Sequence, residues 1–305
     1  MISYKNNVKL GFVGGAYPAP PTIEDRFEKL KWQMAQAHRM GCEVFPGVPM
    51  GFGEEQMKEF IGLMHQYGFE GVGQMPRCVF ELAGPEKNRA EEELCQTLEF
   101  TKYTLGARVL KNGYGRLRRE TSRWNKTPGM TRDEQLSRLT ENLCLAAPIL
   151  EKYGLHYGLE NHLDFKGCEL ASVFAKVNSP CVGSCYDTAN AFYVNCDANE
   201  DIPYLSKWAL TTHIKDTKII DSPFNGPDGP MIAVGCAVGQ GNVDIPRVLD
   251  ALLENSPVRD GLQLIVELGW FGRQVAQENA ADMGAYYRRA CEESLEFIKD
   301  YVKKR

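Results

Sequence analysis

Short apolar runs alternate along this chain with longer stretches in which apolar residues recur every three or four positions. The short runs are typical of buried strands and the longer stretches of amphipathic helices. Their alternation indicates a parallel sheet whose strands are joined by crossover helices. The predicted strands lie at residues 8–14, 43–46, 71–74, 108–110, 156–160, 181–186, 211–214 and 262–267.

A helical pattern follows each predicted strand. Several of these patterns end at a glycine, which can adopt the left-handed conformation that closes a helix and turns the chain toward the next strand. Eight such units in 305 residues predict a (β/α)8 TIM barrel that forms a single domain over residues 1–305. The predicted helices lie at residues 23–39, 54–67, 86–105, 132–153, 169–177, 203–208, 245–255 and 280–304.

A doubly wound open sheet is the competing architecture. Such a sheet binds dinucleotides through a glycine-rich turn that follows the first strand and opens a helix. Here Gly14 and Gly15 are followed by Ala16, Tyr17 and Pro18, a segment that starts no helix. The sequence therefore favours the barrel.

Composition narrows the possible partners. With 43% hydrophobic residues the chain can bury a large core, and its net charge of −5 disfavours nucleic acid and anionic membranes. A small neutral substrate is expected instead. No apolar run reaches the ~18–20 residues that span a bilayer, and the first residues lack the apolar segment of a signal peptide, so we expect a cytoplasmic protein.

Ten cysteines are scattered along the chain, and none forms a Cys-x-x-Cys pair. Because structural zinc sites and disulfide frameworks both show characteristic cysteine spacings, neither is favoured here. We expect reduced, buried thiols.

Polar residues stand at the ends of four consecutive predicted strands. In a (β/α)8 barrel the chemistry lies at the carboxyl ends of the strands, so each of these residues is a candidate for the site. Three carboxylates at one mouth would repel each other strongly unless a cation lay between them. One residue from each strand gives the predicted metal ligands Glu160, Asp187, His213 and Glu267.

Oxygen-rich ligation with one imidazole suits Mn²⁺, which we predict, and Mg²⁺, Co²⁺ and Zn²⁺ are the alternatives. The competing interpretation is that these residues only cap strands and helices. Asp187 could cap the turn that follows it, and Glu267 could pair with Arg273.

The motifs that contain these residues resemble the xylose-isomerase-like TIM-barrel superfamily, the sugar isomerase and epimerase group. The resemblance covers nearly the whole chain in strand order, although its specific motifs lie in the second half. It implies that the four predicted ligands hold one divalent metal. The motifs are Gly-x-Glu-Asn-His at 158–162, Tyr-Asp-Thr-x-Asn at 186–190, Thr-His-Ile-Lys-Asp at 212–216, Gly-Gln-Gly-Asn-Val-Asp at 239–244 and Val-Glu-Leu at 266–268.

The implied activity is isomerisation or epimerisation of a keto-sugar, in which a proton is removed next to a metal-bound carbonyl. In the ketose 3-epimerase branch the two glutamate ligands also act as acid and base, which implies that role for Glu160 and Glu267. Asn190 stands where that branch has histidine, and Lys215 stands near where it has arginine. We expect both residues to contact substrate, with the sugar specificity altered.

His162 follows Glu160 by two positions and could act as a base on the bound substrate, or it could be a loop histidine bonded to Asp164. The Glu-Asn-His arrangement is also similar to the catalytic subunits of C-glycoside deglycosidases. That similarity implies a carbon–carbon lyase as the alternative function. Such a lyase would expel an aromatic aglycone from a 3-oxo-glucoside and would work with a small partner subunit.

Two predicted loops, at about 111–131 and 216–243, are longer than the roughly 2–6 residues of an ordinary connection and are expected to act as lids. Trp270, just after Glu267, could stack on a sugar ring or fill the core. The first loop carries Arg116, Arg118 and Arg119, which could hold an anion or form a solvated face. Aromatic residues in the last predicted helix permit a homo-oligomer.

Overall fold

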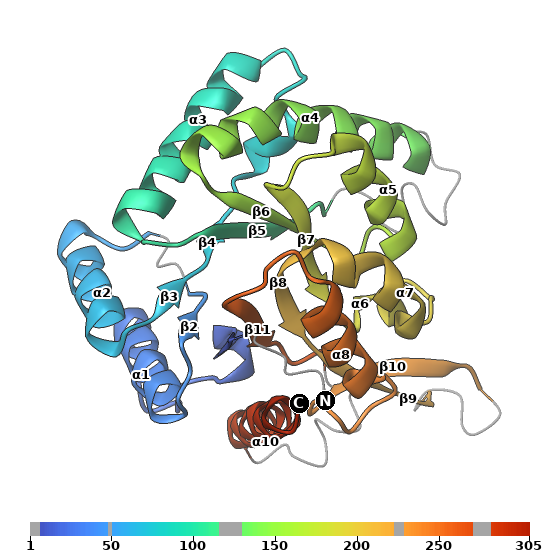
Figure 1. Ribbon diagram of the computed structural model, residues 1–305. Coiled ribbons are helices and arrows are strands. Elements are labelled where there is room, and N and C mark those ends of the chain that lie inside the picture. The colour runs from blue at the N-terminus through green and yellow to red at the C-terminus, as the bar shows by residue number, and fades with distance from the viewer. Residues whose placement is uncertain (1–6, 48–50, 116–129, 223–228, 271–281) are drawn as a thin grey trace.

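The protein is a ring of parallel strands surrounded by helices (Figure 1). The structure, a computed structural model, describes residues 7–47, 51–115, 130–222, 229–270 and 282–305. Nine strands pair in the order β3-β2-β1-β11-β8-β7-β6-β5-β4. Only Val72 separates β3 (Glu70–Gly71) from β4 (Gly73–Gln74), so the chain itself closes the ring. The predicted (β/α)8 barrel is confirmed. The other strands of the ring are β1 (Val8–Phe12), β2 (Val44–Phe45), β5 (Val109–Gly113), β6 (His156–Glu160), β7 (Val182–Asp187), β8 (Ala209–Ile214) and β11 (Leu262–Val266).

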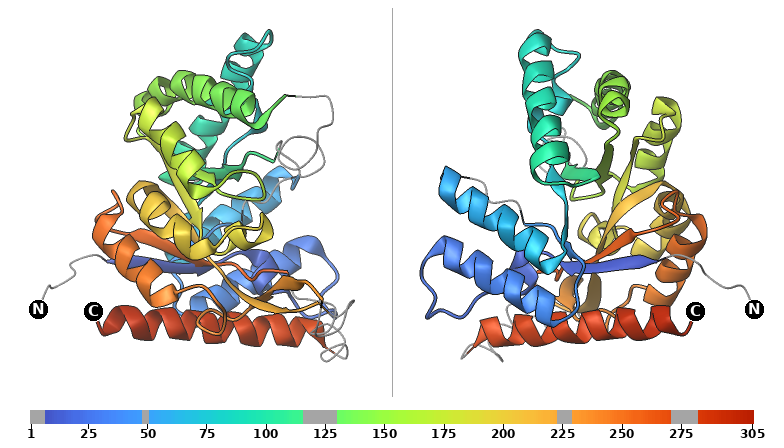
Figure 2. Two further views of the ribbon diagram at one scale, coloured as in Figure 1. Left: turned by 90° about the vertical axis from the view of Figure 1, so that its right-hand side faces the viewer. Right: turned by 60° about the vertical axis from the view of Figure 1, so that its left-hand side comes forward.

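The helices pack around the outside of this ring. The last helix packs against β1 and β11, and therefore covers the place where the last strand of the ring meets the first (Figure 2). No helix among the described residues is long and apolar enough to cross a membrane. The helices are α1 (Arg26–Arg39), α2 (Glu54–Tyr67), α3 (Lys87–Glu99), α4 (Arg132–Tyr153), α5 (Gly167–Val177), α6 (Asn190–Tyr193), α7 (Ala198–Leu205), α8 (Ile245–Asn255) and α10 (Met283–Lys303).

The helix predicted at 203–208 begins earlier than expected, at Ala198. The side chain of Asp197 caps this helix by accepting a hydrogen bond from the amide of Asn199. Pro203, which the prediction placed at the start of the helix, lies inside it. The prediction of buried thiols is also wrong for Cys144 and Cys168, which are exposed, although all ten cysteines are free as expected.

A second small sheet, which the sequence did not predict, lies in the long segment after β8. Here β9 (Asp216–Asp221) pairs antiparallel with β10 (Met231–Cys236). The two carboxylate oxygens of Asp216 accept hydrogen bonds from the amides of Thr217, Gly239, Gly241 and Val243. A Cβ on Gly241 would lie only 2.1 Å from Asp216, so this glycine is required for the loop to wrap around the carboxylate.

Alternation along the strands determines which side chains point into the barrel. A small apolar cluster that includes Val109 and Ile265 fills the interior, separate from the main core under the helices. Because every second residue of a strand faces the same side, Lys111 and Glu267 point into the barrel one layer closer to its carboxyl-end mouth.

Asp201 on α7 anchors the beginning of α5, directly after the segment that carries His162. Its Oδ1 accepts a hydrogen bond of 2.9 Å from the amide of Gly167. Its Oδ2 has no hydrogen-bond partner among the described residues. Burial raises the pKa of Asp201 from 3.8 to about 6, although the bond from Gly167 opposes this rise.

A raised pKa means that the folded protein binds this proton more tightly than the unfolded chain, so the stabilisation is complete below pH ~4 and is lost as the pH rises through ~6. We therefore expect Asp201→Asn to raise the free energy of unfolding by roughly 2–3 kcal/mol at pH 8 and by little at pH 4. Urea unfolding at several pH values measures this. Asp221→Asn, at an exposed position, is the control, and a gain for Asp201→Asn that did not depend on pH would contradict the assignment.

Candidate metal centre

Four strand ends bring three carboxylates and one imidazole together at the barrel mouth. Glu160 ends β6, Asp187 ends β7, His213 lies on β8, and Glu267 follows β11. One ligand atom from each residue lies within 4.8 Å of the ligand atoms of the other three. Asp187 and His213 are direct partners in the β7–β8 register, so neighbouring strands present them side by side.

His213 lies at the centre of this cluster. Its Nδ1 is 2.6 Å from Oε2 of Glu267, 3.5 Å from Oε1 of Glu160 and 4.0 Å from Oδ2 of Asp187. Neither nitrogen of the buried ring, nor Oδ2 of Asp187, makes a hydrogen bond of good geometry within the described part of the chain. Buried polar atoms are rarely left in this state, and a coordinated cation would satisfy them.

A buried lysine forms ion pairs with two carboxylates of the cluster. Lys215 is only 1% exposed, and its Nζ lies 2.8 Å from Oδ2 of Asp187 and 3.5 Å from Oε1 of Glu267. It also donates a hydrogen bond to Oδ1 of Asn190, whose Nδ2 donates to Glu160. Asn190 and Lys215, which we predicted to contact substrate, therefore position the carboxylates. Direct contact with substrate stays a prediction.

The electrostatics follow from burial and from opposite charges. Burial alone would raise the pKa of Glu160, but the positive charge of His213, whose Nδ1 lies 3.5 Å away, lowers it to about 2. Burial alone would lower the pKa of His213, but Glu267 and Glu160 raise it to about 9. Burial raises the pKa of Asp187 despite the neighbouring Lys215. Protonated His213 and Lys215 thus compensate the carboxylates when no metal is bound.

Aromatic residues lie beside the cluster. Trp270 is 54% exposed, so the alternative that it fills the core is wrong. Its ring lies edge-on to Tyr193, with centroids 5.0 Å apart, and edge-on to His162, with centroids 6.3 Å apart. The amide of Gly235 in β10 donates to the carbonyl of Trp270, so the hairpin holds this residue in place. His162 lies with these aromatic residues and is not among the four clustered ligands.

Lys111 on β5 was missed by the sequence analysis. Burial and the charges within the cluster dominate the pKa values of Glu160, His213 and Glu267, but the ammonium of Lys111 is close enough to lower each of them further. Its position two residues after the interior Val109 was the signal that could have revealed it. Four predicted candidates lie outside the described residues, namely Arg116, Arg118, Arg119 and Arg273.

Removal of Lys215 tests this electrostatic balance. Lys215→Met leaves Asp187 as a buried charge without its ammonium partner, so the free energy of unfolding of the metal-free protein should fall by about 3–5 kcal/mol. Saturating Mn²⁺ should recover more stability in this variant than in the wild type, because a bound cation replaces the missing charge. Thermal and urea unfolding with and without Mn²⁺ measure both effects. Lys207→Met, at an exposed site, is the control, and equal metal-free stability of the Lys215→Met variant and the wild type would refute the account.

Comparison with known structures identifies the same fold. A structure of L-ribulose 3-epimerase has 14% sequence identity and a TM-score of 0.63, covering 97% of this chain and 95% of that one. A xylose isomerase-like TIM barrel protein from Mycobacterium smegmatis, in complex with magnesium, has 15% identity and a TM-score of 0.61, covering 97% and 100%. The IOLI protein with a bound zinc atom has 18% identity and a TM-score of 0.62, covering 97% and 99%.

Identities this low show the fold alone, and no curated protein matches the chain significantly. The family assignment comes from a sequence model described as "Xylose isomerase-like TIM barrel", which matches residues 34–300. That range begins within α1, ends within α10 and includes all four clustered residues of the mouth. The chain therefore belongs to the xylose isomerase-like TIM barrel family.

Proposed function

We propose that this protein is a divalent-metal-dependent isomerase or epimerase of keto-sugars. The convergence of Glu160, Asp187, His213 and Glu267 within 4.8 Å carries this proposal. Membership of the family supports it, and so do the names of similar structures, which include L-ribulose 3-epimerase and D-psicose 3-epimerase.

The donor set fits a divalent cation. Three carboxylates and one imidazole match the preference of Mn²⁺, with Mg²⁺, Co²⁺ and Zn²⁺ as alternatives, and three buried atoms of this set lack hydrogen bonds within the described residues. When bound, such a cation would polarise the carbonyl of the substrate and stabilise negative charge on its oxygen.

Glu160 and Glu267 are the proposed acid and base. Glu160 ends β6 and Glu267 follows β11, and β7 and β8 lie between these strands in the ring. The two carboxylates therefore approach a bound ligand from different sides. Neighbouring cations lower the pKa of each despite burial, so both are ionised and able to accept a proton at neutral pH. Removal of a proton by one glutamate and its return by the other on the opposite face would invert the carbon.

Other residues would orient the substrate. Trp270 offers an exposed ring on which the apolar face of a sugar can pack. His162, which lies edge-on to it, is placed to contact the same ligand and remains a proposed catalytic base. Lys111 contributes positive charge from β5, which lies on the other side of β6 from β7, β8 and β11. There it would stabilise negative charge that develops on the substrate oxygens.

The exposed aromatic group also fits a second candidate function, the carbon–carbon lyase. Trp270 and Tyr193 could pack against the aromatic aglycone of a 3-oxo-glucoside. The first step of the lyase reaction would be the same proton removal. The aglycone would then leave, whereas in epimerisation a proton returns. A small partner subunit would complete that pocket.

Deuterium exchange tests the proposed function. The Mn²⁺-loaded protein in D₂O should introduce deuterium into at least one of a panel of ketohexoses, and NMR detects this incorporation. Release of aglycone from an aromatic C-linked 3-oxo-glucoside, with no exchange into ketohexoses, would favour the lyase. No reaction with either substrate class would contradict both proposals.

The two-base assignment makes a sharper prediction. In Glu160→Gln and Glu267→Gln, loaded with Mn²⁺ as checked by electron paramagnetic resonance, epimerisation should fall on the order of 10²–10⁴-fold. Each variant should still exchange deuterium into the one epimer whose proton faces the remaining glutamate, because that base can remove and return a proton on its own side. Exchange into both epimers by either variant would show that the missing glutamate is not a base.

Lys111→Met should lower kcat on the order of 10²–10³-fold, because developing negative charge loses a fixed cation, whereas Lys111→Arg should retain most of the activity. Steady-state kinetics on the active ketose, with metal content verified, measures this. A rise in KM with unchanged kcat would show instead that Lys111 only binds the ground state of the substrate.

A further inference from the structure

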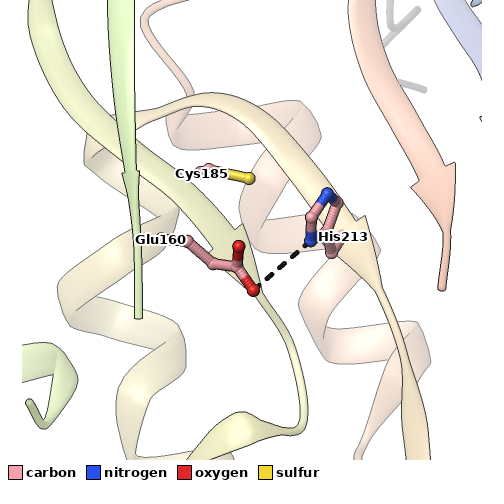
Figure 3. Close-up of side chains that lie close together, drawn as sticks. All are labelled: Glu160, Cys185 and His213. Carbon is pink, nitrogen blue, oxygen red and sulfur yellow. Dashed lines mark ion pairs between the residues drawn. The ribbon is translucent and has the colours of Figure 1, made fainter. Parts of the chain in front are cut away.

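A cysteine lies against the four predicted metal ligands. One ligand atom each from Glu160, Cys185 and His213 lie within 4.8 Å of one another, and all three residues are buried. Figure 3 shows the carboxylate of Glu160 and the sulfur of Cys185 both directed toward the imidazole of His213. Sequence reasoning favoured no cysteine ligand, because this chain has no paired cysteine spacing. A single cysteine on a barrel strand needs none, since the fold supplies its partners.

Cys185 lies two residues before Asp187 on β7, and its partner in the β6–β7 register is Glu160. A Cβ added to Gly158 would lie 3.2 Å from Cβ of Cys185 and 3.2 Å from Cγ2 of Thr211, so these three positions face one another across the interior. Each lies two residues before a residue of the clustered mouth layer. Gly158 is required here, because even a single Cβ would also lie only 3.0 Å from the backbone nitrogen of Cys185.

His213 links the two layers. All of its ion pairs with the carboxylates run through Nδ1. Its Nε2 is also buried and has no hydrogen-bond partner in the part of the chain that the structure describes. The carboxylates therefore approach the imidazole at Nδ1 alone.

We propose that Glu160, Cys185 and His213 form an alternative metal position, deeper along β7 than Asp187, that takes thiophilic divalent cations such as Zn²⁺ or Cd²⁺. A thiolate, an imidazole and a carboxylate are all common zinc ligands, and the sulfur favours a softer ion than Mn²⁺ or Mg²⁺. Binding replaces the proton of the thiol by the cation, and that proton is released to solvent. Ligand atoms of a tetrahedral zinc site lie roughly 3.5 Å apart, so small side-chain rotations would close the site.

The two positions exclude each other because they share Glu160 and His213. An ion held by Cys185 would lie deeper than one held by Asp187 and Glu267, farther from the mouth where substrate enters. Cys185 is thus a residue that determines which metals occupy the productive position. The inference rests on these side chains and uses no assumption about the sugar.

Cadmium absorption provides the test. Metal-free wild type should bind one Cd²⁺ with an ultraviolet sulfur-to-cadmium charge-transfer band, and excess Mn²⁺ should suppress this band. Cys185→Ser should lose the band and bind Cd²⁺ about tenfold or more weakly, because a direct ligand is removed. Cys181→Ser, a buried thiol just before the start of β7, is the matched control and should keep the band.

X-ray absorption on zinc-loaded wild type gives a reading that needs no variant, and one sulfur is expected among the atoms bound to zinc. The proposal is overturned if neither metal binds, if zinc and cadmium bind without sulfur, or if the band persists in Cys185→Ser. A band that survives saturating Mn²⁺ would refute mutual exclusion. Because all these readouts follow the metal alone, their failure is distinct from failure of the epimerase assay.

Discussion

Concentrated negative charge at the barrel mouth is the constraint on which the rest of this site depends. Glu160, Asp187 and Glu267 present three carboxylates around one buried imidazole, and the desolvation of each charge costs several kcal/mol unless it is compensated. Lys215 supplies one permanent positive charge, and protonated His213 supplies a second. A divalent cation in place of the imidazole proton would bring these groups close to neutrality, so the same geometry is well suited to hold one.

Alternation of side chains distributes this chemistry between neighbouring residues. Lys215 turns into the barrel, whereas Asp216, the next residue, turns outward and gathers the amides of the 239–243 loop. The hairpin that starts at Asp216 reaches back to the carbonyl of Trp270 through Gly235. The segment after β8 therefore positions the carboxylates through Lys215 and the exposed ring of Trp270 through Gly235. A substitution at Lys215 or in the β9–β10 hairpin would therefore alter the site, because the backbone between them is continuous.

The barrel and the four clustered residues could be predicted because both follow from repetition. Eight strand–helix units admit few arrangements, and in a closed parallel ring the carboxyl ends of β6, β7, β8 and β11 must meet. Lys111 and Cys185 escaped the sequence analysis for a different reason. Both residues lie inside strands, and the sequence does not show which face of a strand points into the barrel. The packed positions of Val109 and Gly158 identify that face. The β9–β10 hairpin was missed because its pairing is local and independent of the repeating unit.

The layered interior gives a physical reason why one barrel can present two kinds of ligand. Moving two residues along a strand changes the layer and keeps the inward direction, so β7 offers a carboxylate at Asp187 and a thiol at Cys185 along the same line. Hard and soft donors thereby lie around a common imidazole, and Gly158 allows the close packing of Cys185 and Thr211 at the deeper level. Metal preference in this chain then depends on the balance between two adjacent layers. Substitution in the deeper layer can shift that balance while the residues proposed for proton transfer stay in place.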